Sequence, residues 1–234
     1  GVFVLIATSC KKDENNGDET PITVTDIDGN VYHTVTIGTQ VWMVENLKTT
    51  KYNDGTKMFS YNQLGDVYDY CYYDGDSAKY NNKFGCLYSW DAVNSGKLAP
   101  KGWHVPTEAE WTTLQKYLIA NGYNYDKSTT DNKIAKALAA TTDWLYDASE
   151  GAIGNDILNN NLSGFSALPG GLYDANSGKT YKDFGKVGYW WTSTEFDISH
   201  SWRICLYNNY SHLIKDHGSS KTYHFYSVRC IRNK

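Results

Sequence analysis

Apolar and polar residues alternate along the segment from Ile22 to Leu47, "ITVTDIDGNVYHTVTIGTQVWMVENL". A period of two is typical of half-buried β-strands. The alternation breaks at "DGN" (28–30) and at "GTQ" (38–40), whose residue types favour tight turns. The pattern therefore predicts strands joined by hairpin turns in this segment.

Helical spacing replaces the alternation in the middle of the chain. Leu87, Trp90 and Val93 recur at helical intervals and the run closes on Gly96, which predicts a short helix. A third, shorter helical patch is predicted at "NKIAKALAA" (132–140). Between the two lies the strongest helix signal.

That signal follows Pro106. Thr107 and Glu110 have the spacing of a capping box, in which each side chain accepts a hydrogen bond from the backbone amide of the other. Three apolar residues then fall on one face of the helix, which we expect to be core: Trp111, Leu114 and Leu118.

Short β-prone runs separated by Gly, Asn and Ser clusters fill the chain from Gly164 onward. The order of strands, then helices, then strands predicts an α+β domain with segregated helices. We expect one domain over residues 22–234, with two to three short helices, a mainly antiparallel, twisted sheet and long loops.

The composition narrows the classes of function. The chain has 234 residues with 15% aromatic side chains and a formal net charge of −4, so no phosphate-neutralising field is present and nucleic acid is not an expected partner. Tryptophan is highly buried on average. We therefore expect these tryptophans in the core: Trp42, Trp90, Trp103, Trp111, Trp190 and Trp191. Because successive side chains of a strand point to opposite faces, we expect one of the adjacent pair Trp190 and Trp191 to point outward.

The first residues, "GVFVLIATSC", form an apolar run that is too short to span a membrane and that ends at Cys10. "IATSC" resembles a bacterial lipobox, which implies a signal peptide remnant at 1–9 and a lipidated Cys10. Residues 10–21 are polar and acidic, typical of a flexible tether, and resemble the export signal of Bacteroidetes surface lipoproteins. We expect an exported protein held at the outer membrane or cell surface by its lipid alone. The alternative is a fortuitous apolar terminus before a charged linker.

Four further cysteines, an even number in an exported chain, permit disulfides. Their neighbourhood in the sequence favours Cys71 with Cys86 and Cys205 with Cys230. Buried free thiols are the alternative.

Several motifs carry a family resemblance: "LYSWDAVN", "PKGWHVPTEAEWTTLQKYL", "GFSALPGGLY", "GYWWTSTE" and the terminal "SVRCIR". From about Gly38 to Arg232 the chain resembles the Fibrobacter succinogenes major paralogous domain, a family similar in fold to C-type lectins and to formylglycine-generating proteins. The resemblance implies a C-type-lectin-like fold. It leaves function open, because such folds include sugar binders, protein binders and an oxidase.

Catalysis and metal binding are not expected. "HVPTEAEW" is similar to a motif of formylglycine-generating proteins, but their chemistry needs two nearby reactive cysteines, whereas Cys205 and Cys230 lie in separate predicted strands with only Arg203 and Arg229 beside them. The sequence has no calcium-lectin signature. Hairpin turns account for the polar loops "DGDSAKYNN" and "YDANSGK", and solvated loops account for His200, His212, His217 and His224. We expect no metal and no cofactor.

The stretch 207–227, "YNNYSHLIKDHGSSKTYHFYS", has no helical or strand rhythm and is predicted to form loops between two strands. Its Tyr, Ser, Asn and Gly content is that of antibody binding loops. We expect it to bind an extracellular protein or glycan, and a polar loop of a structural or adhesive surface protein is the alternative. The candidate ligand-binding residues are Trp202, Tyr207, Asn208, Asn209, Tyr210, His212, Tyr223, His224 and Tyr226.

The residue types of this stretch also fit a genetic mechanism. Asn codons mutated at their adenines never encode Trp, Met, Glu, Gln or Lys, and only Lys215 and Lys221 within 207–227 belong to that forbidden set. Lectin-fold proteins are known hosts of diversity-generating retroelements, which vary a C-terminal segment in this way. The hypothesis is that this chain is the variable protein of such an element.

Overall fold

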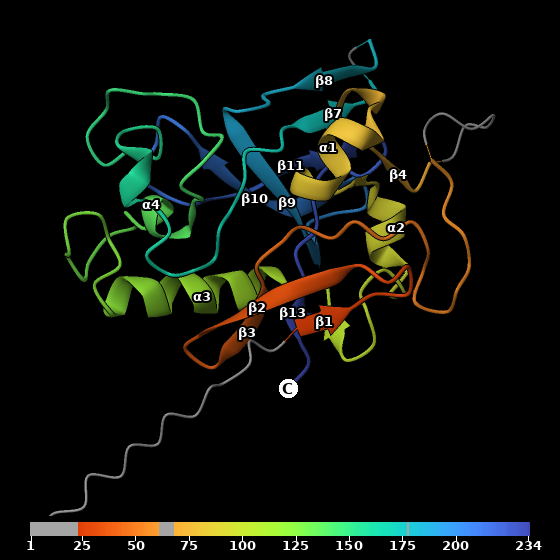
Figure 1. Ribbon diagram of the computed structural model, residues 1–234, viewed down its shortest axis with the longest axis horizontal. Helices are drawn as coiled ribbons and strands as arrows, with labels where there is room; N and C mark the ends of the chain where they lie inside the picture. The colour runs from red at the N-terminus through yellow and green to blue at the C-terminus, as the bar shows by residue number, and fades with distance from the viewer. Residues whose placement is uncertain (1–22, 61–67, 177) are drawn as a thin grey trace, which may run out of the picture.

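The computed structural model describes residues 23–60, 68–176 and 178–234 (Figure 1). The α-helices are α1 (Ser77–Phe84), α2 (Trp90–Asn94), α3 (Glu108–Ala120) and α4 (Ala135–Leu138), with short 3₁₀ turns at Tyr73–Gly75 and Ile157–Asn159. The strands are β1 (Thr23–Thr25), β2 (Val31–Ile37), β3 (Gln40–Met43), β4 (Tyr70–Cys71), β5 (Leu87–Tyr88), β6 (Trp103–His104), β7 (Leu172–Asp174), β8 (Thr180–Lys182), β9 (Val187–Glu195), β10 (His200–Tyr207), β11 (Ile214–Ser220), β12 (His224–Phe225) and β13 (Ile231–Arg232). Short helices and several antiparallel sheets confirm the α+β class.

One sheet joins the two ends of the described chain. Its strand order is β1-β2-β3-β13-β6, so the predicted hairpins of residues 22–47 are confirmed and the last strand lies between β3 and β6 (Figure 1). Ile231 in β13 pairs with Trp42 on one side and His104 on the other. The C-terminal motif therefore closes the fold onto its first strands.

A second sheet, β11-β10-β9, has side chains packed on both of its faces. Trp190 and Ile204 join a cluster around α3, whereas Trp191 and Cys205 join the other large cluster. Trp190 and Trp191 are 1% and 0% exposed, so the expectation that one of them points outward was wrong. Strand alternation does separate the two rings, but each face of this sheet has its own core.

The capping box at the start of α3 is confirmed. The Thr107 hydroxyl accepts from the Glu110 amide at 3.2 Å, and the Glu110 carboxylate accepts from the Thr107 amide at 2.8 Å. Trp111, Leu114 and Leu118 are buried, as the helical spacing predicted.

Two local predictions needed correction. Leu87 belongs to β5 rather than to a helix, because Ser89 caps α2 and the helix begins at Trp90. Asp76, expected in a hairpin turn, accepts a hydrogen bond from the Lys79 amide and caps α1. The other predicted turn is confirmed, since the β7–β8 hairpin pairs Asp174 with Thr180.

The stretch 207–227 is not a continuous loop. It contains β11 and β12, and β11 pairs with β10 through partners that include Cys205 with Ile214 and Arg203 with Asp216. The sequence pattern did not predict β11, because β11 is an edge strand and its polar side chains are mostly half-buried or exposed.

The four cysteines of the described residues are free and buried in this structure, which is the alternative that the sequence left open beside the two favoured disulfides. Cys71 lies opposite Leu87 in the β4–β5 pair, and Cys86 precedes Leu87, so strand alternation directs the two thiols to opposite faces. Cys205 lies in the sheet of β9, β10 and β11, whereas Cys230 directly precedes β13 of the five-stranded sheet.

Cys10 and the expected boundaries at residues 9 and 21 lie outside the described residues. Within the described ranges, no helix has the length and apolarity needed to cross a membrane.

Candidate functional site

The nine candidate ligand-binding residues do not form one surface. Five lie at the turn of the β10–β11 hairpin, which we call the turn end (207–212). Three lie at the opposite end of the hairpin, which with its neighbouring turns we call the open end (195–202 and 217–224). Ser201 and Tyr207 are six residues apart along one strand, or roughly 20 Å at about 3.3 Å per residue. A single small ligand therefore does not contact both ends.

The turn end binds other loops of the protein itself. The Asn208 amide donates to the Lys186 carbonyl at 2.8 Å, and the Asn208 carbonyl accepts from the Gly154 amide at 2.7 Å. The Tyr210 carbonyl accepts from the Ile153 amide at 3.3 Å. These bonds hold residues 153–154 against the hairpin, so the turn supports the fold here.

Aromatic contacts continue at this end. The rings of Tyr207 and Tyr210 lie 5.3 Å apart, and Tyr210 stacks on His212 at 5.0 Å. Tyr210 is 41% exposed and Asn209 is exposed, whereas the other three residues are half-buried. Only part of the turn end is therefore open to a partner.

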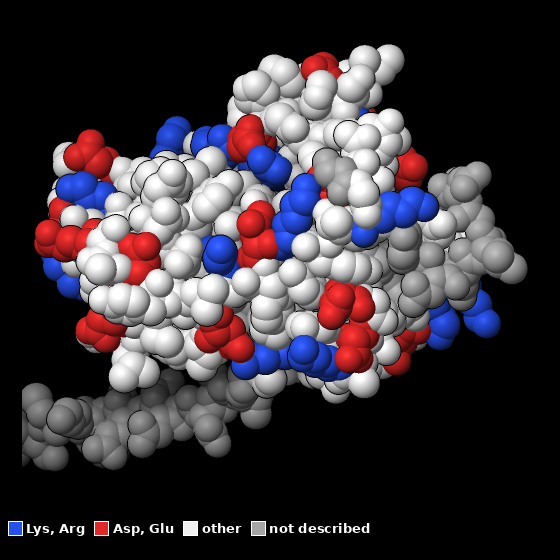
Figure 2. Space-filling view, turned by 90° about the horizontal axis from the view of Figure 1, so that it is seen from above, with Lys and Arg blue, Asp and Glu red and all other residues white. Residues whose placement is uncertain are grey.

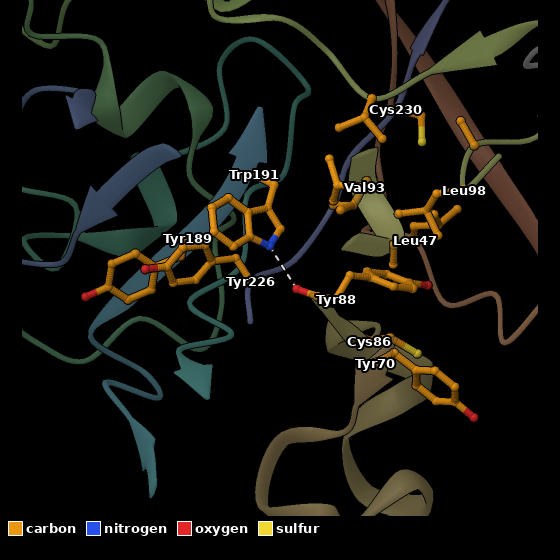
Figure 3. Close-up of a cluster of buried hydrophobic side chains, with 14 of the residues drawn as sticks. Leu47, Tyr70, Cys86, Tyr88, Val93, Leu98, Tyr189, Trp191, Tyr226 and Cys230 are labelled. Carbon is orange, nitrogen blue, oxygen red and sulfur yellow. Dashed lines mark hydrogen bonds between the residues drawn. The ribbon is translucent and has the colours of Figure 1, made fainter. Parts of the chain in front are cut away.

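Tyr226 lies in the core and is 0% exposed. Its ring stacks on Tyr189 at 5.3 Å and contacts Trp191 at 4.5 Å, as the cluster in Figure 3 shows. Arg203 donates to the Tyr226 hydroxyl at 2.6 Å. Burial raises the pKa of Tyr226 to about 12 although Arg203 opposes the shift. In this structure the side chain is out of reach of a ligand.

At the open end, Trp202 belongs to a surface aromatic cluster. Its ring meets Phe196 edge-on at 5.7 Å and His217 at 5.0 Å, and Phe196 stacks on His217 at 3.9 Å. Phe196 is 48% exposed, and Ile198 in the same turn is 95% exposed. Such a group of exposed rings and an aliphatic side chain is typical of contact surfaces.

Beside this cluster lies a groove of about 570 Å³, which we call the open-end groove. Five segments contribute to it, namely the residues just before β4, α2 with its cap, the β7–β8 turn, the β9–β10 turn, and the β11–β12 turn with the end of β12. Its lining residues are Tyr68, Ser89, Trp90, Asp91, Asn94, Ala175, Lys179, Glu195, Ile198, Lys221, Thr222, Tyr223 and Phe225. Tyr223, one of the predicted residues, is 42% exposed and lies in this groove.

Lys221 holds the turns of the groove together. Its ammonium donates to the Asp197 carbonyl at 2.6 Å, pairs with Glu195 at 3.1 Å and lies 5.6 Å from the centre of the Trp90 ring. The lysine therefore connects the β9–β10 and β11–β12 turns and covers the Trp90 side chain beneath it.

His224 lies half-buried next to the groove. Its Nδ1 accepts a hydrogen bond from the Ser220 amide at 3.1 Å. Burial lowers the pKa of His224, and the positive charge of Arg203 lowers it further. The imidazole is thus held neutral, and it fixes the end of β11.

Most groove residues gave no signal in the sequence as site residues. Asp91 and Asn94 lie on α2, and Lys179 lies in the β7–β8 turn, more than 80 residues away along the chain. The sequence predicts a helix and a hairpin for the two segments, and both are present. The segments form one groove only because they pack against the C-terminal turns.

A second groove, of about 560 Å³, lies on the α4 side of the molecule. Residues following α3 and the amide-rich segment 155–162 line it, including Tyr123, Asn155 and the exposed Leu158. None of the nine predicted binding residues lines it.

The thiols of Cys205 and Cys230 are buried, and their surroundings favour the protonated form. Burial raises the pKa of Cys205 to about 12 although Arg203 opposes the shift, and burial also raises the pKa of Cys230. Arg203 is engaged with Asp216, and Arg229 donates to the Phe165 carbonyl. In the part of the chain that the structure describes, no group of three or more His, Cys, Asp or Glu side chains has metal-binding geometry.

Fold and site together define an α+β domain whose turns at the open end form an amphipathic surface groove. The sequence-family model of the Fibrobacter succinogenes major domain matches residues 35–232 of the chain. The chain therefore belongs to this family, as its motifs indicated. No curated protein and no solved structure matches it.

Proposed function

We propose that this chain is a non-catalytic, calcium-independent recognition module with a C-type-lectin-like fold, which binds a protein or glycan through the open end of its β10–β11 hairpin. The open-end groove carries the proposal. Five segments of the chain converge on it, and its lining includes Tyr223 and Ile198, which are both exposed. Binding sites are commonly built from loops on a rigid scaffold.

The charge distribution supports recognition of a protein or glycan rather than binding of nucleic acid. Lys and Arg are interspersed with Asp and Glu on the face that Figure 2 shows, with no extended patch of one sign. The buried thiols with raised pKa values support a non-catalytic role, because a thiolate is the reactive form of cysteine.

The proposal places the module outside the cell, held at the outer membrane through a lipid on Cys10. The lipobox-like "IATSC" and the acidic tether support this location. Replacement of Cys10 by Ala should move the protein from the membrane fraction to the soluble fraction. Retention of Cys10→Ala in the membrane would contradict lipid anchoring.

Diversification of the C-terminal segment is part of the same proposal. It is supported by the two lysines in 207–227 that mutation of Asn codons at their adenines cannot encode. Lys215 pairs with Glu108 at 2.6 Å and donates to Thr112 at 2.7 Å, while Lys221 connects the groove turns. Both lysines therefore have structural roles, as residues excluded from variation should. The test is genomic: an Asn-rich near-copy of 207–227 should lie next to a reverse transcriptase gene.

Binding is tested with the purified protein on combined glycan and protein arrays. The variant is Tyr223→Ala, and its matched control is Tyr146→Ala, since Tyr146 is 78% exposed and does not line the groove. We expect at least one ligand whose binding is lost in the first variant and kept in the second. Equal binding by both variants to every array element would defeat the proposal.

A further inference from the structure

We infer that the open-end groove recognises an uncharged glycan rather than a charged ligand or a protein surface. This inference rests on the proposed function and names the ligand class of the same site. Three properties of the groove carry it: its charge balance, its mixture of rings and small polar groups, and its size.

The ionisable lining of the groove sums to zero formal charge. Asp91 and Glu195 carry negative charge, and Lys179 and Lys221 carry positive charge. The pair of Lys221 and Glu195 at 3.1 Å is satisfied within the protein. Clefts that attract charged ligands are lined predominantly by one sign of charge, which raises the local concentration of the opposite sign. This groove offers no such attraction to an acidic sugar, a phosphate or a basic peptide.

The remaining lining combines rings and two aliphatic side chains, Ala175 and Ile198, with hydroxyl and amide groups. Of the four rings in the lining, Trp90 and Phe225 are 2% and 4% exposed and Tyr68 is half-buried, so Tyr223, at 42%, is the ring most accessible to a ligand. Ser89, Asn94 and Thr222 contribute small polar side chains around it. A sugar ring has an apolar face that packs on an aromatic ring and a rim of hydroxyls that exchange hydrogen bonds with such groups.

Asp91 adds an acceptor for ligand hydroxyls. No ion pair to Asp91 is formed within the described residues, and its side chain on the exposed surface of α2 lines the groove. A carboxylate accepts several hydrogen bonds at once and donates none at neutral pH. It therefore suits a ligand rich in O–H donors.

The size of the groove favours a small ligand over a protein surface. Its volume of about 570 Å³ lies within the range of about 300–1,000 Å³ found for small-ligand sites. A stable protein interface instead buries about 800 Å² on each partner. The groove thus accommodates a short oligosaccharide or the end of a longer chain.

The test measures binding of the full chain to neutral glycans, acidic glycans and proteins on one array, followed by titration calorimetry of the neutral glycan with the strongest array signal. We expect neutral glycans to bind and the affinity to change less than about twofold between 0.05 and 0.5 M NaCl, because screening acts on charge attraction. Tyr223→Ala should abolish binding. Asp91→Asn should weaken it severalfold, because an amide keeps one acceptor and loses the charge-assisted bonds. Tyr146→Ala should bind as the unaltered protein does.

The outcomes distinguish a failure of this inference from a failure of the proposed recognition function on which it rests. Binding of acidic glycans or of proteins that is lost in Tyr223→Ala would overturn the neutral-glycan inference and leave the recognition function intact. Neutral-glycan binding that falls more than tenfold in high salt would also overturn it. Absence of any ligand that depends on Tyr223 would overturn both.

Discussion

The two ends of the β10–β11 hairpin have similar residue types but different environments. At the turn end, the backbone carbonyls of Asn208 and Tyr210 accept from the amides of residues 153–154, and the Asn208 side chain donates to the Leu145 carbonyl at 3.2 Å. At the open end, Tyr223 and its neighbours line a groove that faces solvent. Tyrosine and asparagine are equally suited to binding a partner or binding another loop of the same chain. Composition therefore identified a segment that makes contacts, and packing decides whether these contacts are internal.

The comparison is sharpest between Tyr226, which is buried, and Tyr223, which is exposed. Of the variants considered, Tyr226→Ala should lower the stability of the fold most. Loss of a fully buried ring that packs on Tyr189 and Trp191 should lower the free energy of unfolding by about 3–5 kcal/mol. Urea denaturation measures it. Tyr226→Phe keeps the ring and loses two hydrogen bonds, the one from Arg203 and the one that the hydroxyl donates to Ser219 Oγ at 3.3 Å, for an expected cost of about 2 kcal/mol. Full stability of Tyr226→Ala together with lost ligand binding would reassign Tyr226 to the binding surface.

Asn132→Ala tests the anchor at Leu213, the residue that directly follows the turn end, and should have the next largest effect on stability. The Asn132 amide donates to the Leu213 carbonyl at 2.7 Å and its oxygen accepts from the Leu213 amide at 3.2 Å. Loss of both bonds should cost about 1–2 kcal/mol and should speed hydrogen exchange at the Leu213 amide. The control is Asn209→Ala, an exposed residue of the same turn, with an expected change within about 0.5 kcal/mol. Equal effects of the two variants would mean that the turn does not depend on this anchor.

His224 should make stability at the open end depend on pH. Burial lowers the pKa of this imidazole in the folded state, and its Nδ1 accepts from the Ser220 amide in the neutral form. Between the ordinary value of 6.5 and the lowered folded value, the unfolded chain binds more protons than the folded one. The free energy of unfolding should therefore be highest above pH 6.5 and should fall as the pH drops through this window.

Denaturation of the protein and of His224→Asn at several pH values between 4.5 and 7.5 measures this contribution. The variant should lose part of the slope that the unaltered protein shows. An unchanged slope in His224→Asn would show that His224 does not titrate as inferred.

Local patterns in the sequence were sufficient for much of the fold. The alternation of residues 22–47 and the capping box of Thr107 and Glu110 depend on neighbours within a few residues, and both are confirmed. The edge strand β11 was missed because a half-exposed strand carries no apolar alternation. Cys71 and Cys86 were paired by proximity in the sequence, but the register of β4 and β5 directs their thiols to opposite faces.

The candidate site depends on long-range packing and was less predictable. Tyr223 was predicted because it lies in a segment of unusual composition. Asp91 and Lys179 were not, because their role in the groove arises only when α2 and the β7–β8 turn pack beside the C-terminal turns. Tyr226 lies three residues from Tyr223 and has the same side chain, so composition could not separate a buried tyrosine from an exposed one.

The smallest expected effect on stability belongs to Tyr223→Ala, and it completes the comparison. Because this residue is already 42% exposed and no core cluster includes it, truncation should change the free energy of unfolding by no more than about 0.5 kcal/mol. The same variant should lose ligand binding. Urea denaturation and array binding on one preparation measure both quantities, with Tyr146→Ala as the control for surface tyrosines. A large loss of stability would show that Tyr223, like Tyr226, is used inside the molecule, and that the open end resembles the turn end after all.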